Sequence, residues 1–403
     1  MSAPKPHIAI LGSGPVGLEA ALAAASAGCP FTLYEAGPKV AAHVRSWGHV
    51  RLFTPWEMNV SQRMRQALEA TGREVPEGAE CPTGRELVDR LLAPVAALPT
   101  LSPALRLGTR VVAVGREGLL KHEEISTPER GRHPFHLLLS DAQGNEWTER
   151  ADVVLDATGT YGHPNRLGNG GILAPGERAL GNFIRRDIPD FAREAAEWAG
   201  QTVLLVGAGH SAQTAARDLA ELARQAPDTR VVWALRGAEP DWGAQPGDPL
   251  PERARLTEIA AELAAGTSPA VEVSRGVSVE ALKRKDSGAE VVLKNGASST
   301  LVVDRILALT GYVGDHELYR QLQIHECYAT CGPIKLSAAL LGAGAGDCLA
   351  QTSHGAETLT NPEPGFFILG CKSYGRNNTF LMRVGWQQVD EIFGALGVQG
   401  SLG

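Results

Sequence analysis

Two glycine-rich segments of the chain have the residue types and the spacing to bind the pyrophosphate of a dinucleotide. They are Gly12-Ser-Gly-Pro-Val-Gly17 and Gly207-Ala-Gly-His-Ser-Ala212. In such a loop the first glycine permits a tight turn, the second lets the backbone approach the pyrophosphate, and a small third residue lets helix and strand pack closely. The pyrophosphate then lies at the positive end of the helix. The predicted contacts are Gly12, Gly14, Pro15, Gly17, Gly207, Gly209, His210, Ser211 and Ala212.

One charged residue beyond each loop indicates which dinucleotide the loop binds. Glu35 follows Gly12 by twenty-three residues, where a carboxylate can accept hydrogen bonds from both ribose hydroxyls of an adenosine and repels a 2′-phosphate. This favours FAD or NAD at the first loop. Arg236 ends the corresponding strand after the second loop, where a guanidinium can pair with a 2′-phosphate. This favours NADPH over NADH, unless Arg236 is a solvated charge at a strand end.

The hydrophobic pattern places each loop between a strand and a long helix. Apolar runs with β-branched residues predict strands, and alanine-rich amphipathic runs predict helices. The two strand-helix-strand units cover residues 7–35 and 202–236. Further strands are predicted at 109–115, 135–140, 153–157, 271–274, 290–294, 300–309 and 366–370, and further helices at 61–70, 83–97 and 379–396.

The order of these elements predicts an α/β protein of two Rossmann-like domains. A Gly-, Pro- and Asn-rich stretch at 162–176 has almost no periodicity, which indicates a crossing between domains. The chain beyond residue 312 has no third glycine loop, so it is expected to return to the first domain. We therefore expect an FAD-binding domain at 1–165 and 313–403, with an NAD(P)H-binding domain inserted at 166–312.

The composition is that of an ordinary globular protein and argues against several functions. The 403 residues include 38 basic and 45 acidic side chains, a net charge of −7, so no basic surface is expected to attract nucleic acid or anionic lipid. The apolar stretch at 8–27 is interrupted by three glycines and Glu19, unlike a signal segment or membrane span. Six cysteines, mostly far apart, do not resemble a secreted disulfide framework. We expect a cytoplasmic protein.

With both loops placed, the chain resembles the flavoproteins with two dinucleotide-binding domains, and among them the flavin-containing monooxygenase group. Residues 207–212 match the G-x-G-x-S-A loop of that group, and Ala157-Thr-Gly159 and Leu309-Thr-Gly-Tyr312 match its domain-junction motifs. The resemblance implies a glutathione/thioredoxin reductase-like architecture and a role for Thr158 and Gly159 at the flavin. The chain departs from the group's F-x-G-x-x-x-H fingerprint, because the segment 177–195 contains no histidine.

The resemblance also implies flavin contacts outside the glycine loop. Related proteins lay a loop beside the flavin where this chain has Arg45, Ser46, Trp47 and Thr54, although these residues would equally suit an aromatic-stabilised surface loop. In many relatives a strand ends in Gly-Asp, and the aspartate contacts the ribityl chain of the flavin. Here Gly370 is followed by Cys371, Lys372 and Ser373, so either the backbone of these residues or the Ser373 side chain is expected to take over that contact. The next helix, capped by Asn377 or Asn378, would stabilise an anionic reduced flavin.

Substrate contacts are expected among polar and aromatic residues in irregular segments near the predicted domain junction, where clefts usually form. Each could equally be a packing or surface residue. Arg51 and Arg376 would suit an anionic substrate if both face the pocket. The candidates are His49, Asn59, Tyr161, Trp242, Tyr374 and Arg376.

Cys327 and Cys331 form a C-x3-C pair, and disulfide reductases share the predicted two-domain plan. Those enzymes place a cysteine pair near the flavin, either after the first nucleotide unit or within the second domain. Residues 36–80 and 200–310 contain no cysteine, so a redox pair at the flavin is disfavoured. A zinc site that adds Cys348 is disfavoured further, because only His325 or His354 could supply a fourth ligand. No metal is expected.

Three functional hypotheses follow. The leading one is an NADPH-dependent monooxygenase that oxidises a small nitrogen- or sulfur-containing substrate through a flavin hydroperoxide. The first alternative is an NADPH-dependent flavoprotein reductase that passes electrons to a disulfide, a quinone or a protein partner. The second is a non-catalytic flavin redox sensor. We expect a small-molecule substrate and O2 as partners, no nucleic acid and no membrane, and leave a homodimer open.

Overall fold

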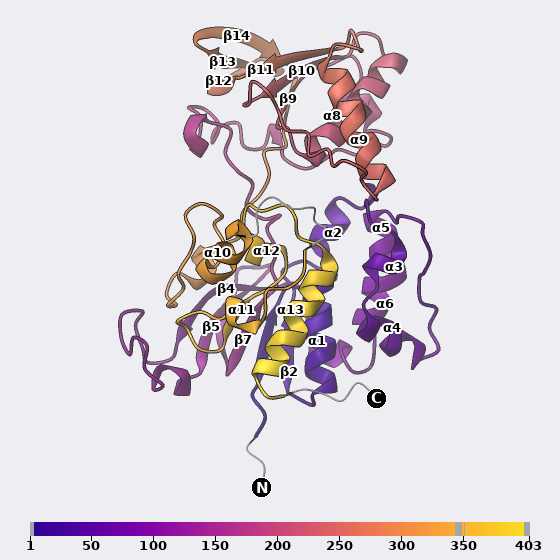
Figure 1. Ribbon diagram of the computed structural model, residues 1–403. Coiled ribbons are helices and arrows are strands. Elements are labelled where there is room, and N and C mark those ends of the chain that lie inside the picture. The colour runs from indigo at the N-terminus through magenta and orange to yellow at the C-terminus, as the bar shows by residue number, and fades with distance from the viewer. Residues whose placement is uncertain (1–3, 343–348, 350, 399–403) are drawn as a thin grey trace. The chain divides into compact units, whose positions relative to one another are not determined.

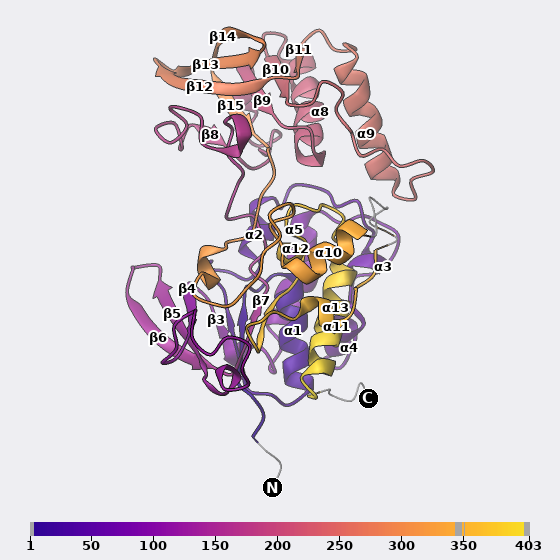
Figure 2. The ribbon, with the colours of Figure 1, turned by 60° about the vertical axis from the view of Figure 1, so that its left-hand side comes forward.

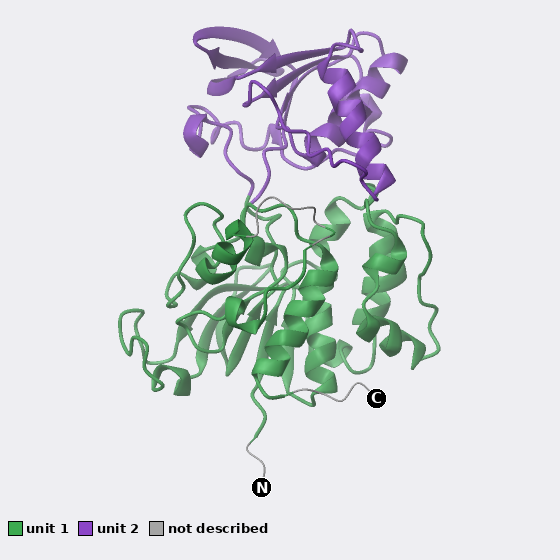
Figure 3. Cartoon of the chain, viewed as in Figure 1, with its two compact units in different colours: residues 1–163, 313–403 green, residues 164–312 purple. Residues whose placement is uncertain are grey.

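The computed structural model describes residues 4–342, 349 and 351–398 (Figure 1). The chain forms two compact units, coloured separately in Figure 3. Unit 1 comprises residues 1–163 and 313–403, and unit 2 comprises residues 164–312. Both units contain a parallel sheet with helices, so the predicted α/β class is confirmed.

Unit 1 is built on a parallel five-stranded sheet with the strand order β16-β7-β1-β2-β3. Apolar strands with every residue buried occupy its centre, as expected for a sheet covered on both faces. The helix α1 (Pro15–Ser26) connects β1 to β2 and packs beside the C-terminal helix α13 (Met382–Ala395; Figures 1 and 2). The strands are β1 (Ile8–Leu11), β2 (Phe31–Tyr34), β3 (Leu105–Arg106), β7 (Val153–Asp156) and β16 (Phe366–Ile368).

An antiparallel sheet of β4 (Thr109–Arg116), β5 (Phe135–Asp141) and β6 (Glu146–Ala151) is inserted between β3 and β7. The predicted strands at 109–115 and 135–140 are confirmed. The strand β6 was not predicted, because most of its residues are polar and exposed, and it lacks an apolar face. Pairing with β5 therefore holds β6 in place, and burial of its own side chains contributes little to its stability.

Short helices complete unit 1. The run predicted as one helix at 83–97 is helical from 84 to 96, but a five-residue π-helical turn at 88–92 interrupts it. The helices are α2 (Ala42–Ser46), α3 (Trp56–Asn59), α4 (Gln62–Glu69), α5 (Gly84–Leu87), α6 (Ala93–Ala96), α10 (Ile334–Gly342), α11 (Ala356–Leu359) and α12 (Cys371–Tyr374), with 3-10 turns at Ser102–Ala104, Arg130–Arg132 and Glu317–Tyr319.

Unit 2 contains a second parallel sheet with the strand order β11-β10-β9-β15-β8, and a three-stranded antiparallel sheet is inserted along the chain between β11 and β15. The helix α8 (His210–Gln225) connects β9 to β10 and begins directly after the second glycine loop. The remaining elements are β8 (Ile184–Arg185), α7 (Ala195–Trp198), β9 (Thr202–Val206), β10 (Arg230–Leu235), α9 (Pro251–Ala264), β11 (Val271–Arg275), β12 (Ser278–Lys285), β13 (Gly288–Asn295), β14 (Ala297–Val303) and β15 (Arg305–Ala308), with a 3-10 turn at Asn169–Gly171.

Two sequence-based expectations need correction. The run at 300–309 is two strands, because β14 pairs antiparallel with β13 whereas β15 pairs parallel with β9. The break falls at Asp304, whose carboxylate accepts a hydrogen bond from the Thr202 N–H at 2.8 Å. The C-terminal helix begins at Met382 with Leu381 as its N-cap, so neither Asn377 nor Asn378 caps it.

No helix among the described residues is long and apolar enough to span a bilayer.

Candidate functional site

The first glycine loop of unit 1 shows a separate steric reason for each of its three glycines. Gly12 has φ of +96°, and a Cβ atom there would lie 2.7 Å from the carbonyl oxygen of Ala157. A Cβ at Gly17 would lie 1.8 Å from the carbonyl oxygen of Gly12. A Cβ at Gly14 would meet no protein atom within 4 Å. Gly12 and Gly17 are therefore needed because the backbone packs too closely there for a side chain. Gly14 instead borders an open space, where a side chain would occupy the position of a ligand.

Glu35 lies at the end of β2 and is held against this loop. Its carboxylate accepts hydrogen bonds from the Ser13 N–H at 3.2 Å, the Ser13 hydroxyl at 2.5 Å and the Gly37 N–H at 2.8 Å. The side chain is buried yet borders the pocket described below. These bonds fix the orientation of the carboxylate at the strand end where an adenosine ribose would bind.

The loop and Glu35 line a pocket of about 700 Å³ that is contained within unit 1. Its wall combines the glycine loop, the ends of β2 and β7, the segment 41–59, and the start of α13. The structure thus brings together many residues that the sequence proposed for cofactor or substrate contact. Those on the wall are Gly12, Gly14, Pro15, Glu35, Trp47, Thr54, Asn59, Thr158, Gly159, Tyr161 and Gly370.

One part of the wall is apolar and aromatic. The Trp47 ring stacks against Tyr161 with a centroid distance of 6.1 Å, and His43 lies equally close to Tyr161. Burial lowers the pKa of His43, so its ring is neutral at pH 7. His43 was not predicted, because a lone histidine in a short helix gives no signal in the sequence. The apolar side chains on the pocket wall include Val44, Leu52, Met58, Leu87, Phe380 and Leu381.

Thr54 and Asn59 form a polar pair on the same wall. The Thr54 hydroxyl donates to Asn59 Oδ1 and Asn59 Nδ2 donates to the Thr54 carbonyl oxygen, both at 2.7 Å. Asn59 is 2% exposed. Among the described residues, Asn59 Nδ2 has one hydrogen-bond acceptor, the Thr54 carbonyl oxygen. The pair therefore fixes the orientation of the Asn59 amide on a mostly apolar wall.

Several residues proposed from the sequence lie off the pocket wall. Arg45 donates to the Val40 carbonyl oxygen and forms an ion pair with Asp89 at 3.4 Å. The Ser46 hydroxyl donates to the His43 carbonyl oxygen at 2.7 Å. These contacts hold the short helix α2 in place and connect it to the helical segment that contains Asp89. The others that are not among the wall residues are Gly17, His49, Lys372, Ser373, Tyr374 and Arg376.

The ends of β7 and β16 are joined by a buried ion pair that the sequence did not reveal. Lys372 Nζ lies 2.6 Å from Asp156 Oδ2 and 3.3 Å from the Thr158 hydroxyl. The other oxygen of Asp156 accepts hydrogen bonds from the Thr158 N–H and hydroxyl. This network joins Thr158 to the start of α12, and both Thr158 and Cys371 line the pocket. Lys372 and Asp156 are far apart in sequence, so no local pattern predicts them.

The second glycine loop, in unit 2, repeats the geometry of the first. Gly207 has φ of +132°, and a Cβ atom there would lie 2.2 Å from the Leu309 carbonyl oxygen. A Cβ at Gly209 would meet nothing within 4 Å, and Ala212 is fully buried between helix and strand. Gly209 is also the N-cap of α8, so the helix begins at the open position. Ser211 is exposed, and burial lowers the pKa of His210.

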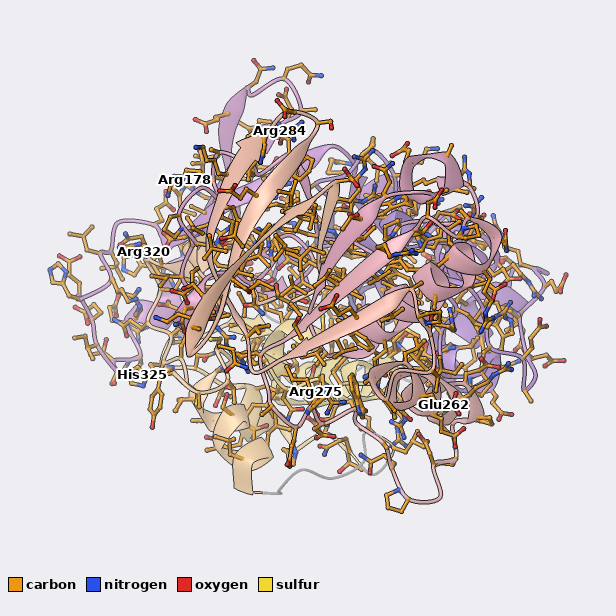
Figure 4. All side chains as sticks on the ribbon, turned by 90° about the horizontal axis from the view of Figure 1, so that it is seen from above. Arg178, Glu262, Arg275, Arg284, Arg320 and His325 are labelled. Atoms are coloured by element: carbon orange, nitrogen blue, oxygen red, sulfur yellow. The ribbon has the colours of Figure 1, made fainter. Side chains whose placement is uncertain are left out.

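Two arginines stand at neighbouring strand ends of unit 2. Arg236 directly follows β10, is exposed, and forms no ion pair with any described residue. Arg275 ends β11 (labelled in Figure 4) and pairs in register with Leu235, the residue before Arg236. The loops that follow are joined by a hydrogen bond from the Gly276 N–H to the Gly237 carbonyl oxygen at 3.2 Å. Arg275 was not predicted as a second basic residue here.

Trp242, proposed as a substrate contact, packs inside unit 2. Its ring lies 5.2 Å from that of Trp233, and its carbonyl oxygen accepts a hydrogen bond from Gln213 Nε2 at 3.0 Å. Gln213 Nε2 also donates to the Ala208 carbonyl oxygen at 2.9 Å. Trp242 therefore supports the second glycine loop.

The cysteines are placed as follows. Cys371 lines the unit 1 pocket, and burial raises the pKa of its thiol. Cys327 and Cys331 lie in one turn and are not on the pocket wall. Cys348, part of the disfavoured zinc hypothesis, lies outside the described residues. Within the described chain no three His, Cys, Asp or Glu residues come together as metal ligands.

Two nucleotide loops on successive α/β units, with a pocket at the first, define an oxidoreductase that binds FAD and NAD(P). Residues 7–327 match the family model of pyridine nucleotide-disulphide oxidoreductases. The chain therefore belongs to the pyridine nucleotide-disulphide oxidoreductase family and is an enzyme. A search of curated protein sequences found no match.

Solved structures similar to the chain include both reductases and monooxygenases. The bacillithiol disulfide reductase of Bacillus cereus is 19% identical with a TM-score of 0.67, covering 97% of this chain and 98% of that one. The ornithine hydroxylase of Pseudomonas aeruginosa, in its reduced form, is 16% identical with a TM-score of 0.62, covering 98% and 99%. The cadaverine monooxygenase of Erwinia amylovora, bound to FAD, is 11% identical with a TM-score of 0.64, covering 99% and 96%. At these identities the likeness establishes the fold alone.

Proposed function

We propose that the chain is an NADPH-dependent flavoprotein monooxygenase that oxidises a small nitrogen- or sulfur-containing substrate with O2. FAD would bind in the unit 1 pocket and NADPH at the unit 2 loop. When bound, the flavin accepts hydride from NADPH and passes the electrons to oxygen. The protein's part is to bind both nucleotides, orient them and exclude water.

The unit 1 pocket fits FAD on steric grounds. The open position at Gly14 leaves room for a pyrophosphate beside the N-terminus of α1, where the helix dipole favours negative charge. The fixed carboxylate of Glu35 can accept hydrogen bonds from the ribose hydroxyls. The first turn of α13, with Met382 and Arg383 on the wall, would place positive potential at the far end of the pocket.

The observation that carries the oxygenation proposal is the make-up of this pocket wall. Among the described residues its only thiol is Cys371, whose raised pKa keeps it protonated. No dithiol on the wall is therefore ready to take electrons from the flavin. The apolar side chains around Trp47 exclude water, which protects a reactive reduced flavin from wasteful decay. The Asn59 amide supplies a fixed donor on the same wall.

Unit 2 suits NADPH in particular. Gly209 leaves the N-terminus of α8 open to a pyrophosphate, and Arg236 is available to a 2′-phosphate at the end of β10. Arg275 adds a second guanidinium at the adjacent strand end. Together they favour the coenzyme with the additional phosphate.

A second candidate function, reduction of a disulfide, is favoured by the turn that contains Cys327 and Cys331. The family name and one of the similar structures also point to this chemistry. Oxygen consumption distinguishes the two. Steady NADPH oxidation with one O2 consumed per substrate oxygenated supports the monooxygenase, whereas NADPH oxidation that requires a disulfide and proceeds without oxygen contradicts it. Steady turnover of either kind excludes the non-catalytic sensor.

A further inference from the structure

Charged and titratable side chains gather around Glu35 on the wall of the unit 1 pocket. Besides Glu35, the wall includes His43, Arg110, His163 and Asp315. His43 comes from α2 and Arg110 from β4, whereas the other two flank the points where the chain leaves and re-enters unit 1. The imidazole of His43 lies among these groups, because the charges of Glu35, Arg110 and His163 all affect its protonation.

The backbone before His43 is joined to the first glycine loop. The Ala41 N–H donates to the Ser13 hydroxyl at 3.1 Å, and that hydroxyl donates to the Glu35 carboxylate. Ser13 precedes Gly14, the loop position that is open to a pyrophosphate. The helix α2 therefore begins beside the loop, and His43 is the second residue of this helix.

The ring of His43 forms part of the pocket wall and is neutral at pH 7. It lies 6.1 Å from the Tyr161 ring, which is also on the wall. Although part of the side chain is exposed, the surrounding wall withdraws the ring from bulk water, and this burial lowers the pKa of His43 below 6.5. The charges of Arg110 and His163 lower the pKa further, whereas the charge of Glu35 raises it.

The other members of the cluster have different electrostatic settings. Arg110 carries its positive charge throughout the pH range of a folded protein, because a guanidinium is effectively always protonated. His163 lies 3.8 Å from the Asp315 carboxylate, whereas His43 forms no ion pair with any described residue. The Glu35 carboxylate is held by three hydrogen bonds from the loop region. An anion at the loop would therefore find a permanent cation in Arg110 and a group that can become one in His43.

We propose that binding of FAD draws one proton from solvent onto His43, and that the imidazolium and Arg110 together hold the pyrophosphate. The pyrophosphate is a dianion, and a negative charge against an imidazole favours its protonated form. The proton stays on the ring while the nucleotide is bound and returns to solvent when it leaves. The inference rests on FAD as the ligand of unit 1, as proposed above, but not on where the flavin passes its electrons.

This coupling makes retention of the flavin depend on pH. Between the pKa of His43 in the apoprotein and its higher pKa in the complex, binding takes up a proton. The affinity for FAD therefore falls as the pH rises through this window, by at most about tenfold per pH unit. Below the window the ring is already charged in the apoprotein, and above it the ring stays neutral in the complex. FAD is thus held more tightly in mildly acidic than in mildly alkaline solution.

Titration of the apoprotein with FAD tests the coupling without any turnover. The change in flavin fluorescence gives the Kd, which should rise roughly 10- to 100-fold from pH 5.5 to pH 8.5. Calorimetry at pH 7 in buffers of different ionisation enthalpy should show that a proton is taken up on binding. ADP-ribose, which carries the same pyrophosphate without the flavin, should give the same uptake. Uptake with FAD but not with ADP-ribose would place the titrating group at the flavin and overturn the proposal.

Three variants assign the proton to its side chain. His43→Gln keeps a neutral polar group and should bind FAD with a Kd that does not vary with pH and matches the weak binding of the wild type at high pH. His43→Lys supplies a permanent charge, so its Kd should also be constant but match the tight binding at low pH. His136→Gln is the matched control, because His136 is exposed on β5 and is not on the pocket wall. It should behave as the wild type.

The outcomes separate this inference from the proposed function. Proton uptake that persists in His43→Gln would assign the proton to another group, His163 first, and overturn the inference. Wild-type protein that binds FAD equally well from pH 5.5 to pH 8.5 would overturn the inference and leave the proposed function intact. Wild-type protein that binds no FAD at any pH would overturn the proposed function as well.

Discussion

The ammonium group of Lys372 lies 2.6 Å from the carboxylate of Asp156, and neither side chain is more than 1% exposed. The pair connects the end of β7 to the start of α12, and Gly314 is required beside it, because a Cβ there would lie 2.6 Å from Lys372 Cγ. The ring of Tyr319 lies 5.0 Å from the ammonium and adds a cation–π contact. Lys372 and Asp156 do not line the pocket themselves, but both bind Thr158, which does.

Removing the cation should strongly destabilise unit 1. Lys372→Met leaves the Asp156 carboxylate buried without its partner, which costs about 3–5 kcal/mol in the free energy of unfolding. The matched control is Arg150→Met, which removes a surface ion pair with Glu117 and should cost about 0–1 kcal/mol. Urea titrations of both variants measure the two costs. Equal costs would show that the buried pair is not a structural requirement.

The glycines of the first loop should separate nucleotide binding from folding. Gly14→Val should abolish FAD binding and leave the apoprotein as stable as the wild type, because the new side chain enters the open position of the loop. Gly17→Ala should instead lower the stability of the apoprotein, because its Cβ meets the Gly12 carbonyl oxygen. Flavin absorbance after purification and thermal unfolding of the apoproteins are the measurements. Full flavin retention by Gly14→Val would remove this loop as the FAD site.

Coenzyme preference should depend on the two arginines at the strand ends. Arg236→Ala should raise the KM for NADPH by roughly 10- to 100-fold, the loss of one charge-assisted contact of about 1.5–3 kcal/mol. The KM for NADH should change little. Arg275→Ala should act in the same direction, whereas Arg224→Ala, at the exposed far end of α8, serves as a control and should have no effect. If Arg236→Ala raises the KM for NADPH and for NADH equally, Arg236 has a structural role and does not contact the 2′-phosphate.

Acid should destabilise unit 2 through Asp248. The nearly buried Arg253 holds the pKa of this carboxyl below its ordinary value of 3.8. A carboxyl with a depressed pKa in the folded state adds stability above its unfolded pKa and loses it as the pH falls through the folded pKa. The stabilisation should therefore be present at pH 5 and above and decline below pH 4. In Asp248→Asn the free energy of unfolding should fall less between pH 5 and low pH than in the wild type. If the two proteins show the same dependence on pH, the Asp248–Arg253 ion pair is not the source of the acid sensitivity.

The sequence revealed the parts of the molecule that are encoded locally. Each glycine loop, its flanking strand and helix, and Glu35 or Arg236 at the strand end lie within about thirty residues, so turn chemistry and periodicity identify them. The strand β6 has no apolar pattern of its own and is held by pairing with the preceding strand β5, and the division of 300–309 into two strands depends on the pairing of β15 with the distant strand β9.

The pocket wall was predictable only in part for the same reason. Trp47 and Thr54 were proposed because related proteins place a loop there, and Asn59 was proposed as a substrate contact near the domain junction; the structure puts all three on the wall. Their neighbours Arg45 and Ser46 lie off it, because Arg45 contacts Val40 and Asp89 and Ser46 contacts His43 instead. Asp156 and Lys372 are 216 residues apart, and only the folded sheet brings them together.

The fate of electrons on the reduced flavin tests the proposed function most directly. The enzyme is reduced with NADPH under anaerobic conditions and then mixed with oxygen carrying an isotopic label, with and without small amine and sulfide substrates. We expect a transient absorbing between the reduced and oxidised flavin bands that decays faster with a substrate, and one labelled oxygen atom in the product. Direct reoxidation to hydrogen peroxide with no labelled product from any substrate, together with NADPH-dependent reduction of a disulfide, would contradict the monooxygenase proposal and establish the reductase in its place.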